Sequence, residues 1–485
     1  MPQGEHRPPR AEPLSHHAGM FIGEIGGRWW LPGQKEIVTG TLRSAWDESP
    51  VVTGTGLLEP ATPENIFPRF GGPFVRHPLV LGRTSDNKLV SLEGVHVSLR
   101  QVHFAAPEDA SIELQAQRAY LGMHFGPEPP TFRGADVQVE FLIDFLNRDA
   151  IEEEWVFRDN RQVGMKLSAS RDEETVIPFP GGTLTIGVDV NLSGDRWRER
   201  RIARVARALF RLDEPVAPDV WLSSYITPLA SLMCLVTGEP VVIESVVFRG
   251  PSAAEPDLRV ELLWRGEPPQ PPRDHVLLPH EILFTAADAP IPLDQILAAW
   301  LRAWKELRPV LELYLATRRR HHLYEEHRLL NLTQAVEAFH RIRVGGHPTD
   351  PRTHDERVKR VLAMLSAKDR KWARLPLKKA ANEFTLADRL NLLVSAHSWM
   401  LGDVVSANPR HFGDEVALTR NYHTHWDAVR GAGATTGVEL WPMNERLTVL
   451  VEACLLTELG FPESAVEECI KRASGSYRAL KLNGY

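Results

Sequence analysis

The chain has 485 residues, of which 43% are hydrophobic and 25% charged, and a formal net charge of −7. This is the composition of an ordinary globular protein, and the length is too great for one hydrophobic core, so we expect two or three domains. The three cysteines, Cys234, Cys454 and Cys469, lie far apart and form no CxxC pair. They support neither a disulfide framework nor a cysteine-based zinc site, and they favour a reducing, cytoplasmic location.

Signals for export and for membrane insertion are absent from the sequence. Residues 1–18 are rich in proline, histidine and charge and lack an apolar stretch, so we expect a disordered N-terminus and no export. No run of eighteen apolar residues occurs, which predicts no membrane span. The GxxxxGK[ST], HExxH and GxSxG motifs are also missing, and with them the usual signatures of ATPases, zinc proteases and serine hydrolases.

Residues 19–264 are predicted to form a β-rich module, with a division into two lobes near residue 165. In the first lobe, short stretches of alternating polarity predict an antiparallel sheet or sandwich, at residues 36–42, 88–92 and 137–141. Two adjacent tryptophans, Trp29 and Trp30, suit a stacking platform for bases. We favour the alternative that one of them anchors the first strand in the core or at an edge.

The second lobe has a mixed pattern. We expect strands at residues 166–170, 183–188, 241–248 and 258–264, and a helix at 229–236. Residues 197–212 place apolar side chains on one side and six arginines elsewhere, which predicts an amphipathic helix. We interpret these arginines as a solvated helix face rather than as an RNA contact.

A proline-rich segment at 265–275 holds four prolines within five residues and predicts a stiff linker at the domain border. After it, residues 276–485 show the three- and four-residue spacing of a helical bundle. We expect Pro309 to kink or split the first helix, and Asp294 and Thr385 to cap helices. The predicted helices span 295–318, 322–344, 354–365, 386–407, 412–429, 444–459 and 464–481. The predicted fold class is therefore α+β and multidomain, a β-rich N-terminal module followed by an all-α bundle.

Positive charge gathers in the helical part. Residues 281–485 hold 28 Lys and Arg against 25 Asp and Glu, whereas residues 1–280 hold 28 against 38. Within residues 341–379 there are twelve basic and four acidic residues. This stretch suits a surface that follows the phosphates of an RNA, although a solvated helix face explains it equally well. The candidate RNA contacts are Arg357, Lys359, Arg360, Arg370 and Lys371.

The sequence RNYHTHW, which begins at Arg420, brings together the groups needed for phosphodiester chemistry. An arginine offers a charged fork of donors for phosphate oxygens, and a histidine can take and give a proton near neutral pH. With RNA as substrate the 2′-hydroxyl is the nucleophile, so a base, an acid and a charge stabiliser suffice without a metal. On a helix Asn421 and His425 share a face, while His423 points elsewhere. The alternative is a solvated helix surface whose arginine pairs with a carboxylate.

Two residues on an earlier predicted helix are secondary candidates for the same pocket. Glu337 and His340 stand three residues apart and face alike, so they suit an additional acid or an orienting group. A helix-surface ion pair is the competing interpretation.

Three stretches carry a resemblance to a known family. Arg420, Asn421 and His425 match the R-x4-6-H signature of HEPN-domain ribonucleases, including the polar residue that usually follows the arginine. Residues 330–341 look like the first long helix of HEPN domains in the ApeA-like anti-phage proteins, and residues 25–33 resemble the start of the N-terminal domain of those proteins. The resemblance therefore touches both ends of the chain.

The resemblance implies an endoribonuclease that needs no metal and no cofactor. His425 would act as general base or acid, Arg420 would stabilise charge on the phosphate, and Asn421 would orient the substrate or His425. It further implies a homodimer that cuts tRNA near the anticodon during phage infection, with the N-terminal module as a sensor of the trigger or a restraint on the nuclease. His423 replaces the usual small or apolar residue, which leaves open which imidazole reacts. A non-catalytic binding or dimerisation module is the alternative function.

Overall fold

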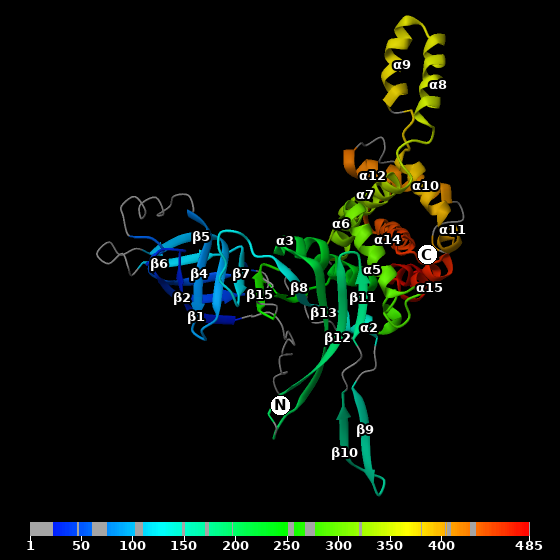
Figure 1. Cartoon of the computed structure of the whole chain (residues 1–485). Coiled ribbons are helices and arrows are strands. Elements are labelled where there is room, and N and C mark those ends of the chain that lie inside the picture. The colour runs from blue at the N-terminus through cyan, green and yellow to red at the C-terminus, as the bar shows by residue number, and fades with distance from the viewer. Residues whose placement is uncertain are drawn as a thin grey trace, which may run out of the picture. The chain divides into compact units, whose positions relative to one another are not determined.

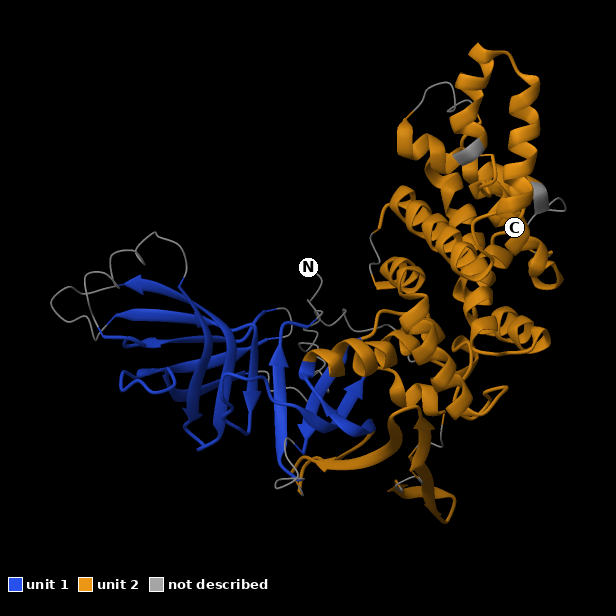
Figure 2. Ribbon diagram, turned by 45° about the horizontal axis from the view of Figure 1, so that its top comes forward, with its two compact units in different colours: residues 1–139, 207–218, 242–269 blue, residues 140–206, 219–241, 270–485 orange. Residues whose placement is uncertain are grey.

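The computed structural model describes most of the chain and divides it into two compact units (Figure 2). The first unit comprises residues 1–139, 207–218 and 242–269, and the second comprises residues 140–206, 219–241 and 270–485. The predicted disordered N-terminus and most of the predicted linker lie outside the described residues. The described residues are 23–45, 48–60, 75–101, 110–147, 151–169, 174–195, 197–250, 257–266, 277–319, 323–379, 381–402, 404, 409–426 and 433–484.

The N-terminal part of the first unit is a closed antiparallel barrel. Its strands follow the order β5-β4-β1-β2-β3-β6, and β6 also pairs with β5, which closes the ring. The antiparallel prediction is thus confirmed, but the arrangement is a barrel rather than an open sheet or a sandwich. Closure leaves no unpaired strand edge in this ring. The strands are β1 (Gly23–Trp30), β2 (Val38–Ser44), β3 (Val51–Thr55), β4 (Val75–Thr84), β5 (Leu89–Gln101) and β6 (Ser111–Gln115).

Trp29 is the anchor of the barrel core. Its side chain is fully buried, and its indole nitrogen donates a hydrogen bond to the carbonyl of Gly40 at 3.4 Å. Trp29 pairs in register with Gly82 on β4, and the absence of a side chain there leaves the space that the indole ring occupies. Trp30 is half-buried and stands edge-on to His124, with the ring centroids 5.6 Å apart. The predicted core anchor is therefore confirmed at Trp29.

Gly82→Ala is expected to destabilise the barrel. An added Cβ would lie 2.1 Å from the Trp29 ring, which is enclosed on all sides and has nowhere to move. Overpacking of this kind costs about 1–3 kcal/mol. Scanning calorimetry should show a lower unfolding temperature. Gly26→Ala in β1 is the matched control, because an added Cβ there meets nothing within 4 Å. Equal unfolding temperatures for the two variants would contradict this account of the Trp29 site.

The rest of the first unit continues the antiparallel pairing. β7 (Arg118–Leu121) pairs with β5 and β15, and β8 (Phe132–Val139) lies between β14 and the C-terminal part of β13. The remaining bounds are β13 (Arg201–Val216), β14 (Ile243–Arg249) and β15 (Arg259–Trp264).

The predicted helix at 197–212 is wrong, because most of this segment is strand β13. Its buried residues alternate strictly, at Ala206, Ala208, Phe210 and Leu212, which is the period of a strand. The segment holds apolar residues at many positions, so the sequence fits both periods. Pairing with β8 decides between them, since cross-strand packing overrides local preference.

Among the described residues, the second unit contains two antiparallel hairpins and the first part of β13, up to residue 206. The hairpins are formed by β9 (Glu152–Arg158) with β10 (Arg161–Ser168) and by β11 (Thr175–Phe179) with β12 (Gly182–Ser193). The second unit also holds α2 (Leu142–Leu146) and a helical stretch made of α3 (Pro218–Trp221), a π-helix (Leu222–Ile226) and α4 (Thr227–Thr237). The indole nitrogens of Trp300 and Trp304 donate to the carbonyls of Pro228 and Ser223, which fixes this stretch on α5. Helix α4 confirms the helix predicted at 229–236.

The stretch Pro218–Thr237 is long and apolar enough to cross a membrane by length and composition. However, 67% of its most apolar window is buried within the structure, and core helices pass the same test. α4 packs against α2, α5 and α6, so the protein itself covers its apolar surface.

The C-terminal region is helical, as predicted (Figure 1). α14 is its central helix and is buried on nearly all sides, while α7 runs beside it with ion pairs Arg328–Glu445 and Arg343–Glu458 at the two ends. The described helices are α5 (Leu293–Glu306), α6 (Arg308–Arg319), α7 (Glu325–Arg343), α8 (Pro351–Met364), α9 (Ala367–Lys379), α10 (Leu386–Ala396), α11 (Ser398–Leu401), α12 (Pro409–His425), α14 (Leu440–Glu458), α15 (Glu463–Ala473) and α16 (Gly475–Leu482), with 3-10 turns at Pro279–Glu281 and Gly437–Glu439.

Several predicted helix boundaries change in the structure. The chain splits before Pro309 into α5 and α6, as expected, and Thr385 caps α10. Helix α9 was not predicted, because it is highly charged and contains Pro376. The helix predicted at 386–407 is divided into α10 and α11, and the one at 464–481 is divided at Ser474, whose side chain caps α16.

Candidate active site

Helix α12 carries the predicted catalytic residues and packs on α10 and α7. Its buried positions Phe412, Val416, Thr419 and His423 follow the spacing of one helix face. Gly413 on this side allows the close approach of α10, since an added Cβ would lie 2.8 Å from the carbonyl oxygen of Ala387. The helix was predicted at 412–429, but it begins at Pro409 and ends at His425. Trp426, which follows it, has a left-handed φ of 52°.

Arg420 is half-buried, and its Nη1 donates a hydrogen bond to Oδ1 of Asn421 at 3.1 Å. Among the described residues Arg420 forms no ion pair with a carboxylate. The Asn421 carboxamide thus engages the guanidinium group rather than the imidazole of His425 within the described part of the chain. One edge of the guanidinium group is held, and its other donors, which bond no described residue, suit the oxygens of a phosphate.

The two histidines of the motif have different environments. His425 is exposed, and its imidazole makes no hydrogen bond to any described residue. His423 is buried, and its Nε2 lies 3.1 Å from the carbonyl oxygen of Thr435. Because a carbonyl only accepts, Nε2 of His423 must carry the proton. The amide of Thr435 in turn donates to the hydroxyl of Thr419, so His423 fastens the following turn to α12.

The secondary candidates Glu337 and His340 on α7 have other described partners. Glu337 accepts a hydrogen bond from Arg341 at 3.1 Å, as an exposed pair one helical turn apart. His340 is fully buried, and its Nδ1 accepts from Nη1 of Arg389 at 3.0 Å. Arg389 also donates to the carbonyl of Gly345, which closes the C-terminal end of α7. The structure therefore joins His340 to α10, and neither residue is hydrogen-bonded to Arg420 or His425.

His340 is expected to make the free energy of unfolding decrease as the pH is lowered past about 6.5. Burial lowers the pKa of His340 below its usual value, and the positive charge of Arg389 lowers it further. On acidification the unfolded chain therefore binds the proton before the folded protein does, and stability present at neutral pH is lost. A difference of one bound proton changes the free energy by at most about 1.4 kcal/mol per pH unit. Urea unfolding at pH 7.5 and 5.5 should show a larger loss for the wild type than for His340→Gln. Equal losses would contradict this assignment.

The structure separates the basic stretch at 341–379 into paired and unpaired side chains. Arg343 forms ion pairs with Glu306 and Glu458, and Arg370 donates to the carbonyls of Leu362 and Leu365 at the end of α8. Arg370 thus closes a turn between two helices. The other four predicted RNA contacts are exposed on α8 and α9 and form no ion pair with any described residue: Arg357, Lys359, Arg360 and Lys371.

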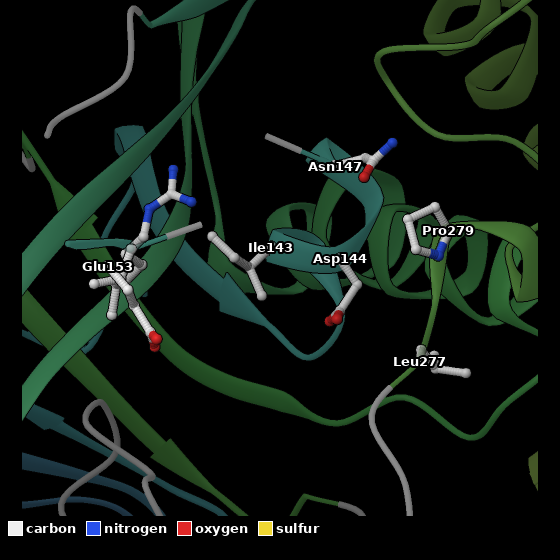
Figure 3. Close-up of a pocket in the computed structure, with 8 residues that line it drawn as sticks. Ile143, Asp144, Asn147, Glu153, Leu277 and Pro279 are labelled. Atoms are coloured by element: carbon white, nitrogen blue, oxygen red, sulfur yellow. The ribbon is translucent and has the colours of Figure 1, made fainter. Parts of the chain in front are cut away.

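Two described cavities are lined by other elements. One, of about 410 Å³, is bordered by Asp144 of α2, Asn147 at the end of that helix, Glu153 of β9 and Leu277, which Figure 3 shows. The other, of about 670 Å³, lies between the π-helix and α5 and is lined by Tyr225, Arg302 and Lys305, among others. No residue of α12 lines either cavity. Among the described residues, no group of three or more His, Cys, Asp or Glu side chains is placed to hold a metal ion.

Comparison with known families matches both regions of the chain. The family model described as ApeA N-terminal domain 1 matches residues 24–300, and the one described as Apea-like HEPN matches residues 330–465. The second match contains α12 and with it Arg420, Asn421 and His425. No curated protein and no solved structure matches the chain. Because the first match alone covers more than half of the residues, the chain belongs to the ApeA family, which joins an ApeA N-terminal domain to an ApeA-like HEPN domain.

Proposed function

We propose that this protein is an anti-phage endoribonuclease that cuts RNA at Arg420 and His425. The ApeA-like HEPN domain supports an anti-phage effector of the HEPN type, and HEPN domains are generally RNase-like. The observation that carries the proposal is the state of the two side chains on α12. Arg420 is matched to no described carboxylate, and His425 is exposed at the end of the helix. A purely structural pair would be buried or matched to acidic residues.

In the proposed reaction the 2′-oxygen of the RNA attacks the adjacent phosphorus. The proton of the 2′-hydroxyl passes to a general base, the bond from phosphorus to the 5′-oxygen breaks, and a general acid protonates that oxygen. The products are a 2′,3′-cyclic phosphate and a 5′-hydroxyl end. Arg420 donates hydrogen bonds to the phosphate oxygens as their charge grows. Asn421 holds the guanidinium group in place, and His425 supplies the imidazole. No metal takes part in this proposal.

We further propose that two copies of the chain form the complete site. HEPN domains typically act as dimers on RNA, and one copy offers a single exposed imidazole at this motif, whereas the reaction uses both a base and an acid. The second imidazole would come from His425 of the other copy. Light scattering of the full chain should give the mass of a dimer. A monomer that cleaves RNA at full rate would exclude this arrangement.

The substrate we propose is tRNA, cut near the anticodon in the cytoplasm after a phage-derived trigger acts on the N-terminal region. Exposed single-stranded loops are the RNA segments that proteins most readily reach, and cleavage there would halt translation. The family match supports this proposal at the level of an anti-phage effector.

The direct test is incubation of the purified full chain with total tRNA in EDTA, followed by analysis of the fragment ends. Cyclic phosphate ends on specific fragments are the expected result. Because a trigger is proposed, the same assay is run on lysates from infected cells that express the protein. Intact tRNA in both assays would leave the non-catalytic binding module as the function.

A further inference from the structure

Helices α8 and α9 form a hairpin that projects from the helical unit (Figure 1). The hairpin is inserted between α7 and α10, the two helices on which α12 packs. Its side chains are almost all exposed, and the fully buried ones are only His354, Val358 and Ala373 among the described positions. The bundle therefore gains little packing from this insertion.

Polar contacts close the hairpin on itself. Nε2 of His354 on α8 lies 2.8 Å from the carbonyl oxygen of Leu377 on α9, and Arg370 donates to the two carbonyls at the end of α8. At the base, the carboxamide of Asn382 bonds both the amide and the carbonyl of Thr349. The hairpin is thus a fixed support for the side chains on its surface.

The surface of the hairpin is strongly positive. Residues 351–379 hold ten Lys and Arg against three Asp and Glu, a net charge of +7 in a chain whose own net charge is −7. Eight exposed cations of this segment form no ion pair with any described residue: Arg352, Arg357, Lys359, Arg360, Lys368, Arg370, Lys371 and Arg374. Of these, Arg370 donates to backbone carbonyls. Such a concentration of unpaired cations attracts a polyanion.

Apolar side chains lie among these cations. Trp372 is 79% exposed and Leu375 is 63% exposed. They follow Lys368 on one face of α9, at the spacing of one and two helical turns, with Lys371 and Arg374 beside them. An exposed aromatic ring flanked by cations is the arrangement with which proteins stack a base while holding its phosphates. These residues stand close together in the sequence, but they could not be assigned to one helix face because helix α9 was not predicted.

We propose that the α8–α9 hairpin is an RNA-binding arm, in which the unpaired cations contact phosphates and Trp372 stacks on an unpaired base. This inference rests on the proposed function, because it supplies a surface that holds the RNA for the reaction proposed at α12. The combination of a net charge of +7 with an exposed tryptophan favours RNA over a protein partner, since phosphates pair with the cations and a base stacks on the ring. Arg370 is left out of the surface because it holds the hairpin closed.

The test measures binding separately from cleavage. The full chain carries His425→Ala to prevent cutting, and its affinity for fluorescent tRNA is followed by anisotropy over a range of salt concentrations. Charge reversal at Lys368, Lys371 and Arg374 to Glu should lower the affinity at least about 30-fold and reduce the salt slope by about 2. Trp372→Ala should lower the affinity about tenfold and leave the salt slope unchanged.

The chain offers a matched control elsewhere in the same unit. Trp197 is 88% exposed, and Arg161, Arg198 and Arg200 are exposed on the strands and turns around β10 and β13. Trp197→Ala and reversal of the three arginines to Glu make the same changes in charge and aromatic surface. These variants should bind tRNA like their parent.

The outcomes separate this inference from the proposed nuclease function. If the hairpin substitutions lower the affinity for tRNA but the wild type never cleaves RNA, the RNA-binding arm is supported and the nuclease function is rejected. Unchanged affinity in both hairpin variants, or an equal loss in the control variants, would overturn the arm even if the wild type cleaves. A change of molecular mass without a change in RNA affinity would show that the hairpin binds a second copy of the chain, and would also overturn it.

Discussion

Replacing His425 with alanine is expected to reduce RNA cleavage by about 10²–10⁴-fold, because the variant lacks the exposed imidazole that exchanges protons in the proposed reaction. Arg420→Ala is expected to reduce cleavage by about 10²–10³-fold, through the loss of a donor to the developing charge on the phosphate. Both side chains are at least partly accessible, so the unfolding temperature should change little. Initial rates on tRNA, with end-group analysis of the fragments, provide the measurement.

Two other histidines of α12 serve as controls for this experiment. His411 is exposed on the same helix, and His411→Ala should cleave like the wild type. His423→Ala should instead lower the unfolding temperature, since the substitution empties a buried position and leaves the carbonyl of Thr435 without its bond to the imidazole. Cleavage that survives both Arg420→Ala and His425→Ala would place the active site elsewhere. Cleavage lost only in His423→Ala, with a normal unfolding temperature, would assign the chemistry to the other imidazole.

The second large effect concerns stability, and Glu452→Ala is expected to lower the free energy of unfolding by about 3–5 kcal/mol. Glu452 is 2% exposed in the centre of α14 and pairs with Arg318 from α6. It also accepts hydrogen bonds from the Tyr314 hydroxyl at 3.1 Å and from the Ser474 hydroxyl at 2.6 Å. Burial raises the pKa of Tyr314 well above its usual value, so this hydroxyl remains a donor at neutral pH. Removing the carboxylate leaves the guanidinium group of Arg318 buried without its counter-charge.

The control for this prediction is an exposed ion pair of the same kind. Glu467 and Lys471 lie one turn apart on α15 at 2.7 Å, and both are about one-third exposed. Glu467→Ala should cost no more than about 0.5 kcal/mol, because water replaces the lost partner. Urea unfolding of the two variants gives the comparison. If Glu452→Ala lowers the free energy of unfolding by less than about 1 kcal/mol, the buried contacts of Glu452 with Arg318 and Tyr314 do not stabilise the bundle as proposed.

Local signals were sufficient for much of the helical region. The three- and four-residue spacing of apolar residues predicted most of its helices, and Thr385 marked the start of α10. Segments with two competing patterns were not decided in this way. The sequence of β13 also fits a helix, and its pairing with β8 makes it a strand. In α9 the many charged residues and a proline obscure the spacing of apolar residues that would predict a helix. For β13 the neighbouring strand, rather than the segment itself, sets the conformation.

Residue order and spacing alone predict a β-rich part followed by a helical part, and one helix that carries an arginine, a carboxamide and two imidazoles within six residues. These properties depend on residue type and spacing, which are local. The burial of His423 against Thr435, the exposure of His425 and the pairing of particular cations in the basic stretch follow from the folded chain. Burial and pairing depend on elements distant in the chain, such as Glu458 opposite Arg343, and no local pattern records which of them will meet.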